Sequence, residues 1–146
     1  MAAADAVHKP SRQLADPKEL LLAYLDYYRS VITRKIEGLT ESELRTSRLP
    51  SGWTPLELIK HLAYMEQRWL RWGFMAEQIP SPHGDQDQAG RWHVRREDTS
   101  AELIAALVAV GERTRTIVSR AELSDLAAVG GRFSDLQPPR ADGGGY

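Results

Sequence analysis

Three helix start signals, each followed by an apolar pattern of helical period, constrain the fold of this 146-residue chain most strongly. They are Asp16-Pro17-Lys18-Glu19, Thr54-Pro55-Leu56-Glu57 and Thr99-Ser100-Ala101-Glu102. In each signal a side-chain oxygen, and a carboxylate three residues later, can accept hydrogen bonds from the free N–H groups of a helix start. No stretch alternates between polar and apolar residues over a useful strand length. The sequence therefore predicts an all-α fold with long helices over residues 17–37, 55–77 and 100–119.

Each predicted helix carries an apolar stripe, which is typical of a helix that packs on one side against a core. The first stripe contains Leu21, Leu25, Tyr28, Ile32 and Ile36, the second Leu58, Leu62, Met65, Trp69 and Trp72, and the third Leu103, Ile104, Leu107, Val108, Ile117 and Val118. A further start signal over residues 40–43 predicts a short helical turn. The prolines and glycines of residues 80–90 indicate a surface loop before the third long helix.

The chain has the length of one domain. Because Asp16 carries the first start signal, we expect a flexible N-terminus over residues 1–15 and a helical bundle over residues 16–126. Beyond Leu126, glycine and proline recur without an apolar period. We therefore expect residues 127–146 to form a disordered tail.

The composition argues against several classes of partner. A formal net charge of -1 gives no attraction to polyanions, so we expect no nucleic-acid partner. No stretch approaches the roughly 20 apolar residues of a membrane span, so we expect no membrane partner either. The absence of cysteine fits a cytoplasmic protein and leaves His, Asp and Glu as the only side chains suited to a metal.

His61 is the main candidate for a chemical role. It lies three residues after Leu58 and four before Met65, so it borders the apolar stripe of the second predicted helix. Such a residue can be a metal ligand or a partly buried histidine hydrogen-bonded to a neighbour, and its spacing alone does not decide. Glu57 can orient His61 from one turn earlier, although its position in the start signal favours a capping role.

Other polar residues allow weaker functional interpretations. Glu66 lies among apolar and aromatic residues and could act as a catalytic base, or it could be an exposed helix carboxylate. His83 and His93 match no compact metal-ligand spacing and are interpreted as loop residues. Arginines alternate with Trp92 over residues 91–96 as in a nucleic-acid patch, but Glu97 and Asp98 follow at once, which favours a solvated helix entry.

The run Ser51-Gly52-Trp53-Thr54-Pro55, followed by Leu58, Lys60-His61-Leu62, Glu66 and Trp69, resembles the DinB-like superfamily, particularly its mini-circle-protein branch. LLAYLDYYRSVITRKIEGLTESEL is similar to that family's first helix and its exit, and RWHVRREDTSAELIAAL to the start of its third. The resemblance implies an up-and-down four-helix bundle. It also implies a divalent metal, such as zinc or nickel, held by one histidine of the second helix and an H-x-x-x-H pair of the fourth. By this resemblance His61 is the first of those ligands.

The resemblance also implies a class of reaction. Some relatives are S-transferases, or isomerases such as the mycothiol-dependent maleylpyruvate isomerase, that use a low-molecular-weight thiol. For this chain it implies a thiol-dependent transferase or isomerase with a small-molecule substrate.

The sequence departs from the family pattern after residue 137. AVGGRFSDLQ is similar to the approach to the fourth helix, but PPRADGGGY follows without an H-x-x-x-H pair. We therefore expect three long helices and no C-terminal helix, through truncation or a change of reading frame. With two of three ligands absent, we expect weak or absent metal binding and impaired catalysis. The alternative is a non-catalytic interaction protein, a homo-oligomer that associates through exposed faces including Leu58, Trp69, Leu103 and Leu107.

Overall fold

The computed structural model describes residues 8–133, which form helices and one β-bridge between Gln86 and Trp92. The long helices are α1 (Pro17–Glu37), α3 (Pro55–Glu66) and α4 (Ser100–Arg120), and α2 (Glu41–Leu44) is a single turn. A π-helix, η1 (Gln67–Phe74), continues α3. The predicted all-α fold is confirmed, and the three predicted long helices are found within three residues of their expected ends when α3 and its continuation η1 are taken together as the second.

The helix starts follow from the capping residues. Thr40, Thr54 and Thr99 form complete capping boxes, in which the threonine oxygen accepts a backbone N–H and a glutamate three residues later binds the threonine N–H. Asp16 caps α1 by accepting a hydrogen bond from the backbone N–H of Lys18 at 2.9 Å. Such caps satisfy N–H groups that a helix cannot satisfy internally.

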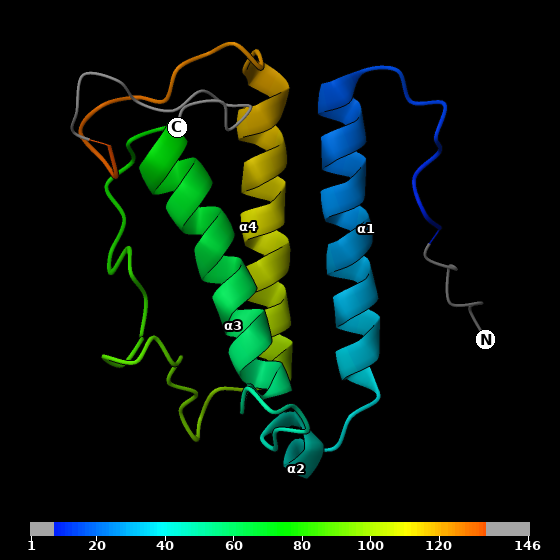
Figure 1. The fold of residues 1–146 in the computed structure, drawn as a ribbon, viewed down its shortest axis with the longest axis vertical. Coiled ribbons are helices and arrows are strands. Elements are labelled where there is room, and N and C mark those ends of the chain that lie inside the picture. The colour runs from blue at the N-terminus through cyan, green and yellow to red at the C-terminus, as the bar shows by residue number, and fades with distance from the viewer. Residues whose placement is uncertain (1–7, 134–146) are drawn as a thin grey trace.

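Figure 1 shows α4 between α3 and α1, and α4 packs against both of them. The chain runs in one direction along α1 and in the opposite direction along α3, as expected for consecutive helices. However, α3 and α4 run in the same direction, because residues 75–99 return along the length of the bundle before α4 begins. The predicted bundle is therefore present, but among residues 8–133 its helices do not alternate in direction throughout.

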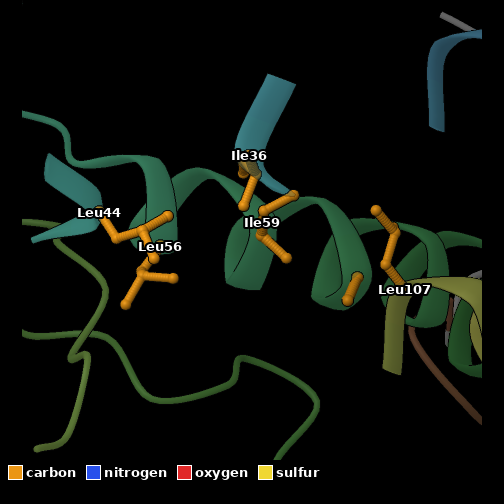
Figure 2. Close-up of a cluster of buried hydrophobic side chains, with 6 residues drawn as sticks. Ile36, Leu44, Leu56, Ile59 and Leu107 are labelled. Atoms are coloured by element: carbon orange, nitrogen blue, oxygen red, sulfur yellow. The ribbon is translucent and has the colours of Figure 1, made fainter. Parts of the chain in front are cut away.

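The hydrophobic core lies where the lower halves of the helices meet in Figure 1. Its buried side chains come from all four α-helices, and Figure 2 draws them as sticks: Ile36, Leu44, Leu56, Ile59, Ala63 and Leu107. Leu56 and Ile59 are completely buried, because they project from α3 toward the packed side of the bundle. These contacts fix the first turns of α3, the part of the fold that carries the candidate site.

Some apolar residues of the predicted stripes remain exposed, because no other described residue covers them. On α1, Leu21, Leu25 and Tyr28 are exposed, and on α3 and η1 the side chains of Leu58 and Trp69 are 40% and 42% exposed. Leu103 and Leu107 were expected on an exposed face only in the interaction-protein alternative, but Leu107 is buried and Leu103 packs against the core. Leu103 and Leu107 pack inward because α4 lies between its two neighbours.

Residues 127–133 pack against η1, although the sequence predicted no structure there. The N–H of Ala128 donates to the carbonyl of Phe74 at 2.8 Å, and that of Arg132 donates to the carbonyl of Trp72 at 3.0 Å. The Arg132 guanidinium lies 4.2 Å from the centre of the Trp69 ring, a cation–π contact. The rest of the predicted tail lies outside the described residues.

Within residues 8–133 no helix combines the length and the apolar character that crossing a membrane requires. The same residues contain no fourth long helix.

Candidate functional site

His61 lies on α3 between two tryptophans that come from different loops. The indole Nε1–H of Trp92 donates a hydrogen bond to His61 Nδ1 at 3.0 Å. The ring of Trp53 meets the His61 ring edge-on, with ring centres 5.2 Å apart. One of the two sequence interpretations of His61, a partly buried histidine bonded to a neighbour, therefore describes its surroundings. Trp92 itself, which the sequence placed in a solvated helix entry, is only 3% exposed.

Gly84 allows Trp92 to approach α3 closely. Gly84 has φ +68°, and a Cβ atom at this position would lie 2.3 Å from the Trp92 ring and 2.9 Å from Tyr64. A left-handed backbone and the absence of a side chain are both needed here. The glycine is visible in the sequence, but the ring that packs against it follows eight residues later and across a turn, so spacing alone does not identify it.

A groove of about 510 Å³ opens beside Trp53, between the end of α1, α2 and the start of α3. Its lining is mainly apolar and comes from α1, α3 and the loops between them: Ile32, Ile36, Leu39, Leu49, Trp53 and Leu58. Three charged side chains, Lys35, Glu43 and Arg48, also line it, and Arg48 pairs with Glu43 at 3.0 Å. This volume is in the range of small-molecule sites. Trp53 therefore contacts both the groove and His61.

Burial lowers the pKa of His61 below its ordinary value of 6.5, and the positive charge of Arg68 lowers it further. Arg68 is held by hydrogen bonds to the carbonyls of Pro82, at 3.0 Å, and His83, at 2.9 Å. Protonation of His61 would also break the bond from Trp92, because Nδ1 would then carry a proton of its own. The neutral imidazole is therefore the form that this site stabilises.

We predict a loss of stability in mild acid that depends on His61. Because the pKa is lower in the folded than in the unfolded chain, the unfolded chain binds the proton first as the pH falls below about 6.5. The stabilising contribution of neutral His61 is present above that pH and decreases toward the folded pKa. Urea unfolding between about pH 5 and pH 8 should show a smaller pH dependence for His61→Asn than for the parent chain. The control is His8→Asn, because His8 is exposed. An equal pH dependence of the unfolding free energy in the parent chain, His61→Asn and His8→Asn would contradict the role of His61.

Glu57 acts as a cap and anchors the loop. Its carboxylate accepts the N–H of Thr54 at 2.8 Å and also pairs with Arg91 at 2.9 Å. Arg91 in turn donates to the carbonyl of Gly52 at 2.8 Å. The capping role favoured by the sequence is confirmed, and no described hydrogen bond joins Glu57 to His61.

Glu66 is neither an exposed carboxylate nor part of the His61 cluster. It accepts two hydrogen bonds from Arg29 of α1, at 2.6 and 2.7 Å, and one from Thr114 of α4 at 2.7 Å. Thr114 is almost fully buried. A carboxylate with these partners holds three helices together, and the role of Glu66 as a catalytic base stays a prediction. Arg29 and Thr114 could not be predicted as partners of Glu66 from sequence spacing, because they lie on other helices.

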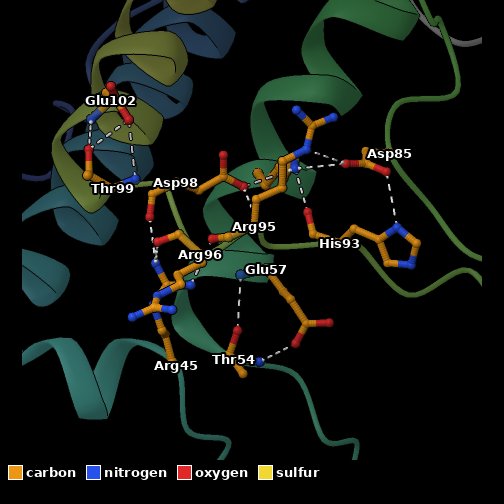
Figure 3. Close-up of polar contacts among 11 residues, drawn as sticks. Arg45, Thr54, Glu57, Asp85, His93, Arg95, Arg96, Asp98, Thr99 and Glu102 are labelled. Carbon is orange, nitrogen blue, oxygen red and sulfur yellow. Dashed lines mark hydrogen bonds and ion pairs between the residues drawn. The ribbon is translucent and has the colours of Figure 1, made fainter.

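Lys60 is the buried cation that fastens residues 85–98 to α3. Its ammonium group donates to the carbonyl of His93 and pairs with Asp85 at 3.5 Å and Asp98 at 3.3 Å. Figure 3 shows these carboxylates and the neighbouring contacts, including the 3.1 Å contact between His93 and Asp85. Arg45 adds hydrogen bonds to three carbonyls of this segment, those of Arg95, Arg96 and Asp98. The polar residues of this loop are therefore used to fix its path.

The candidate metal ligands do not form a binding set. Within residues 8–133, no three His, Asp or Glu side chains are arranged to hold a metal ion. Glu57, Glu66 and Asp85 are paired with cations, and His83 packs edge-on against Trp72 with ring centres 5.3 Å apart. Nδ1 of His61 already accepts a hydrogen bond. These residues do not fit a tightly bound metal in the arrangement observed.

The family model described as Mycothiol-S-transferase matches residues 20–140. No curated protein and no solved structure matched the chain. The matched segment includes the groove, His61 and the helices apart from the first three residues of α1. The match agrees with the DinB-like resemblance of the sequence. The chain therefore belongs to the mycothiol S-transferase family, one of the DinB-like families.

Proposed function

We propose that this chain is a weak thiol S-transferase that brings a low-molecular-weight thiol and an apolar acceptor together beside His61. The observation that carries the proposal is the contact of Trp53 with both the groove and the His61 ring. An apolar groove favours an apolar acceptor, because transfer of apolar surface out of water is favourable. Membership of the family supports a thiol as the second reactant.

In the proposed reaction the protein mainly positions the two reactants and favours ionisation of the thiol. The thiol loses its proton to solvent, its sulfur forms a bond to the electrophilic atom of the acceptor, and the leaving group departs with the electron pair of the broken bond. A thiolate is the nucleophile in such a step, and a nearby positive charge favours its formation. Arg68, whose charge acts on His61, supplies this effect in our proposal. The groove positions the acceptor and excludes water from it.

We further propose that catalysis is impaired relative to family members with a complete metal site. The resemblance implies three histidine ligands, but besides His61 the sequence contains only His8, His83 and His93. None of these three forms an H-x-x-x-H pair. Weak zinc or nickel binding is therefore part of the proposal, and no step of the reaction above depends on a metal.

Leu58→Asp should lower the rate of S-transfer about tenfold or more. The substitution puts a charge into the apolar groove, and a loss of about 1.4 kcal/mol in acceptor binding suffices for this effect. The test follows the conjugate of mycothiol and a hydrophobic alkyl halide by mass spectrometry. Leu126→Asp is the matched control, because Leu126 is also exposed but lies outside the groove. Equal rates for both variants would show that the groove does not hold the acceptor.

A second candidate function is supported by the uncovered faces of α1 and α3. Leu21, Leu25 and Tyr28 lie on one face of α1, and exposed apolar faces of this kind often mediate association. In this alternative the chain is a non-catalytic interaction protein that pairs with another copy. Sedimentation velocity would distinguish the two: a dimer that Leu25→Glu dissociates, without any conjugation activity, would favour the alternative.

A further inference from the structure

The hydrogen bond between Trp92 and His61 determines which imidazole nitrogen carries the proton. An indole N–H can only donate, so His61 Nδ1 must accept with its lone pair. The proton of the neutral ring then lies on Nε2. A histidine that binds a metal through Nε2 has the opposite arrangement, in which Nδ1 carries the proton and donates to an acceptor.

The position of Trp92 is fixed by several contacts. Its ring is buried, lies against the Tyr64 ring at 5.0 Å and fits over Gly84. The residues on either side of it are also held, since Arg91 pairs with Glu57 and the carbonyl of His93 accepts from Lys60. The backbone on both sides of Trp92 is therefore tied to α3, by one ion pair and one hydrogen bond.

The other nitrogen of His61 is available to a ligand. No described residue forms a hydrogen bond with Nε2, and within residues 8–133 no buried side-chain nitrogen or oxygen lacks a partner. A ligand at Nε2 would therefore displace no described hydrogen bond.

We propose that Trp92 fixes His61 as a hydrogen-bond donor at Nε2, so that His61 binds an anionic group rather than a metal ion. The anion that fits the site is a thiolate, and this choice rests on the proposed function. The assignment of the proton to Nε2 does not depend on it. In this account the indole of Trp92 suppresses metal binding by occupying the lone pair of Nδ1.

The first test is ¹⁵N NMR of the histidine-labelled parent chain at about pH 8, where the imidazole is neutral. Nε2 should have the chemical shift of a protonated nitrogen and Nδ1 that of an unprotonated one. The reverse pattern for His61 would overturn the inference. This experiment needs no variant other than His61→Ala for assignment. A chain with the expected pattern but no S-transfer would contradict the proposed function and leave this inference intact.

The second test is a zinc titration followed by calorimetry. Trp92→Phe keeps an aromatic ring but removes the donor, so zinc binding should tighten about tenfold, the order expected for changing the partner of a ligand histidine. The added His61→Ala should remove this gain. Trp53→Phe is the matched control, because Trp53 touches the same imidazole without a described hydrogen bond to it. Equal zinc affinity in the parent chain and Trp92→Phe would contradict the role of Trp92. If Trp92→Phe does not fold, as judged by circular dichroism, the NMR pattern of the parent chain decides.

Discussion

Replacing Glu66 with alanine should lower the free energy of unfolding by about 3–5 kcal/mol, the range for breaking one partner of a buried ion pair. Glu66 and Arg29 have side chains only 15% and 11% exposed and are joined by two hydrogen bonds. Without the carboxylate, Arg29 keeps one partner, Asp26, and Thr114 loses its acceptor. Contacts of α3 with both α1 and α4 are weakened together.

Urea unfolding at neutral pH measures this effect. Glu122→Ala is the control, because Glu122 is 77% exposed and lies 3.7 Å from Lys18, so its loss should change stability by less than about 1 kcal/mol. The double variant Glu66→Leu with Arg29→Met should recover much of the lost stability, since no unpaired charge remains. Similar effects of Glu66→Ala and Glu122→Ala would show that Glu66 does not join the helices.

Lys60→Met should cost about 2–3 kcal/mol. The variant keeps most of the apolar stem but removes the charge that pairs with Asp85 and Asp98, and hydrogen bonds to charged groups contribute about 1.5–3 kcal/mol. Burial alone would raise the pKa of Asp85, but the charge of Lys60 and hydrogen bonds from His93 and Lys60 bring it below its ordinary value.

Hydrogen exchange should locate the effect of Lys60→Met. Amides of residues 85–98 should exchange faster than in the parent chain, whereas those of α1 should change less, because Lys60 fastens only the loop to α3. Lys9→Met is the control, since Lys9 is exposed and lies before the bundle. Unchanged exchange in residues 85–98 would contradict the anchoring role.

The helix boundaries could be predicted from the sequence because they depend on local chemistry. The threonine and glutamate pairs at Thr54 and Thr99 satisfy the first N–H groups of their helices wherever those helices pack. Which apolar residues are buried could not be predicted in the same way. Leu25 and Leu58 lie on apolar stripes, yet they are exposed because α4 packs against other sides of α1 and α3.

The surroundings of the site depend on contacts between distant residues, which a single sequence does not display. His61 was identified from its place beside a stripe, but Trp92 lies 31 positions later and reaches it only because residues 75–99 return along α3. For Glu66 the sequence suggests a catalytic base or an exposed helix carboxylate but not an ion pair, since its partner Arg29 is 37 positions away. The switch from α-helix to π-helix at Gln67 has no local signal that we recognise.

The measurement that tests the account most directly is the rate at which the purified chain joins mycothiol to a hydrophobic alkyl halide, with and without a metal chelator. The account predicts a slow rate above that of the uncatalysed reaction, and one that the chelator does not change. No acceleration under either condition would contradict the proposed transferase. A rate abolished by the chelator and restored by added zinc would show that His61 works as a metal ligand after all.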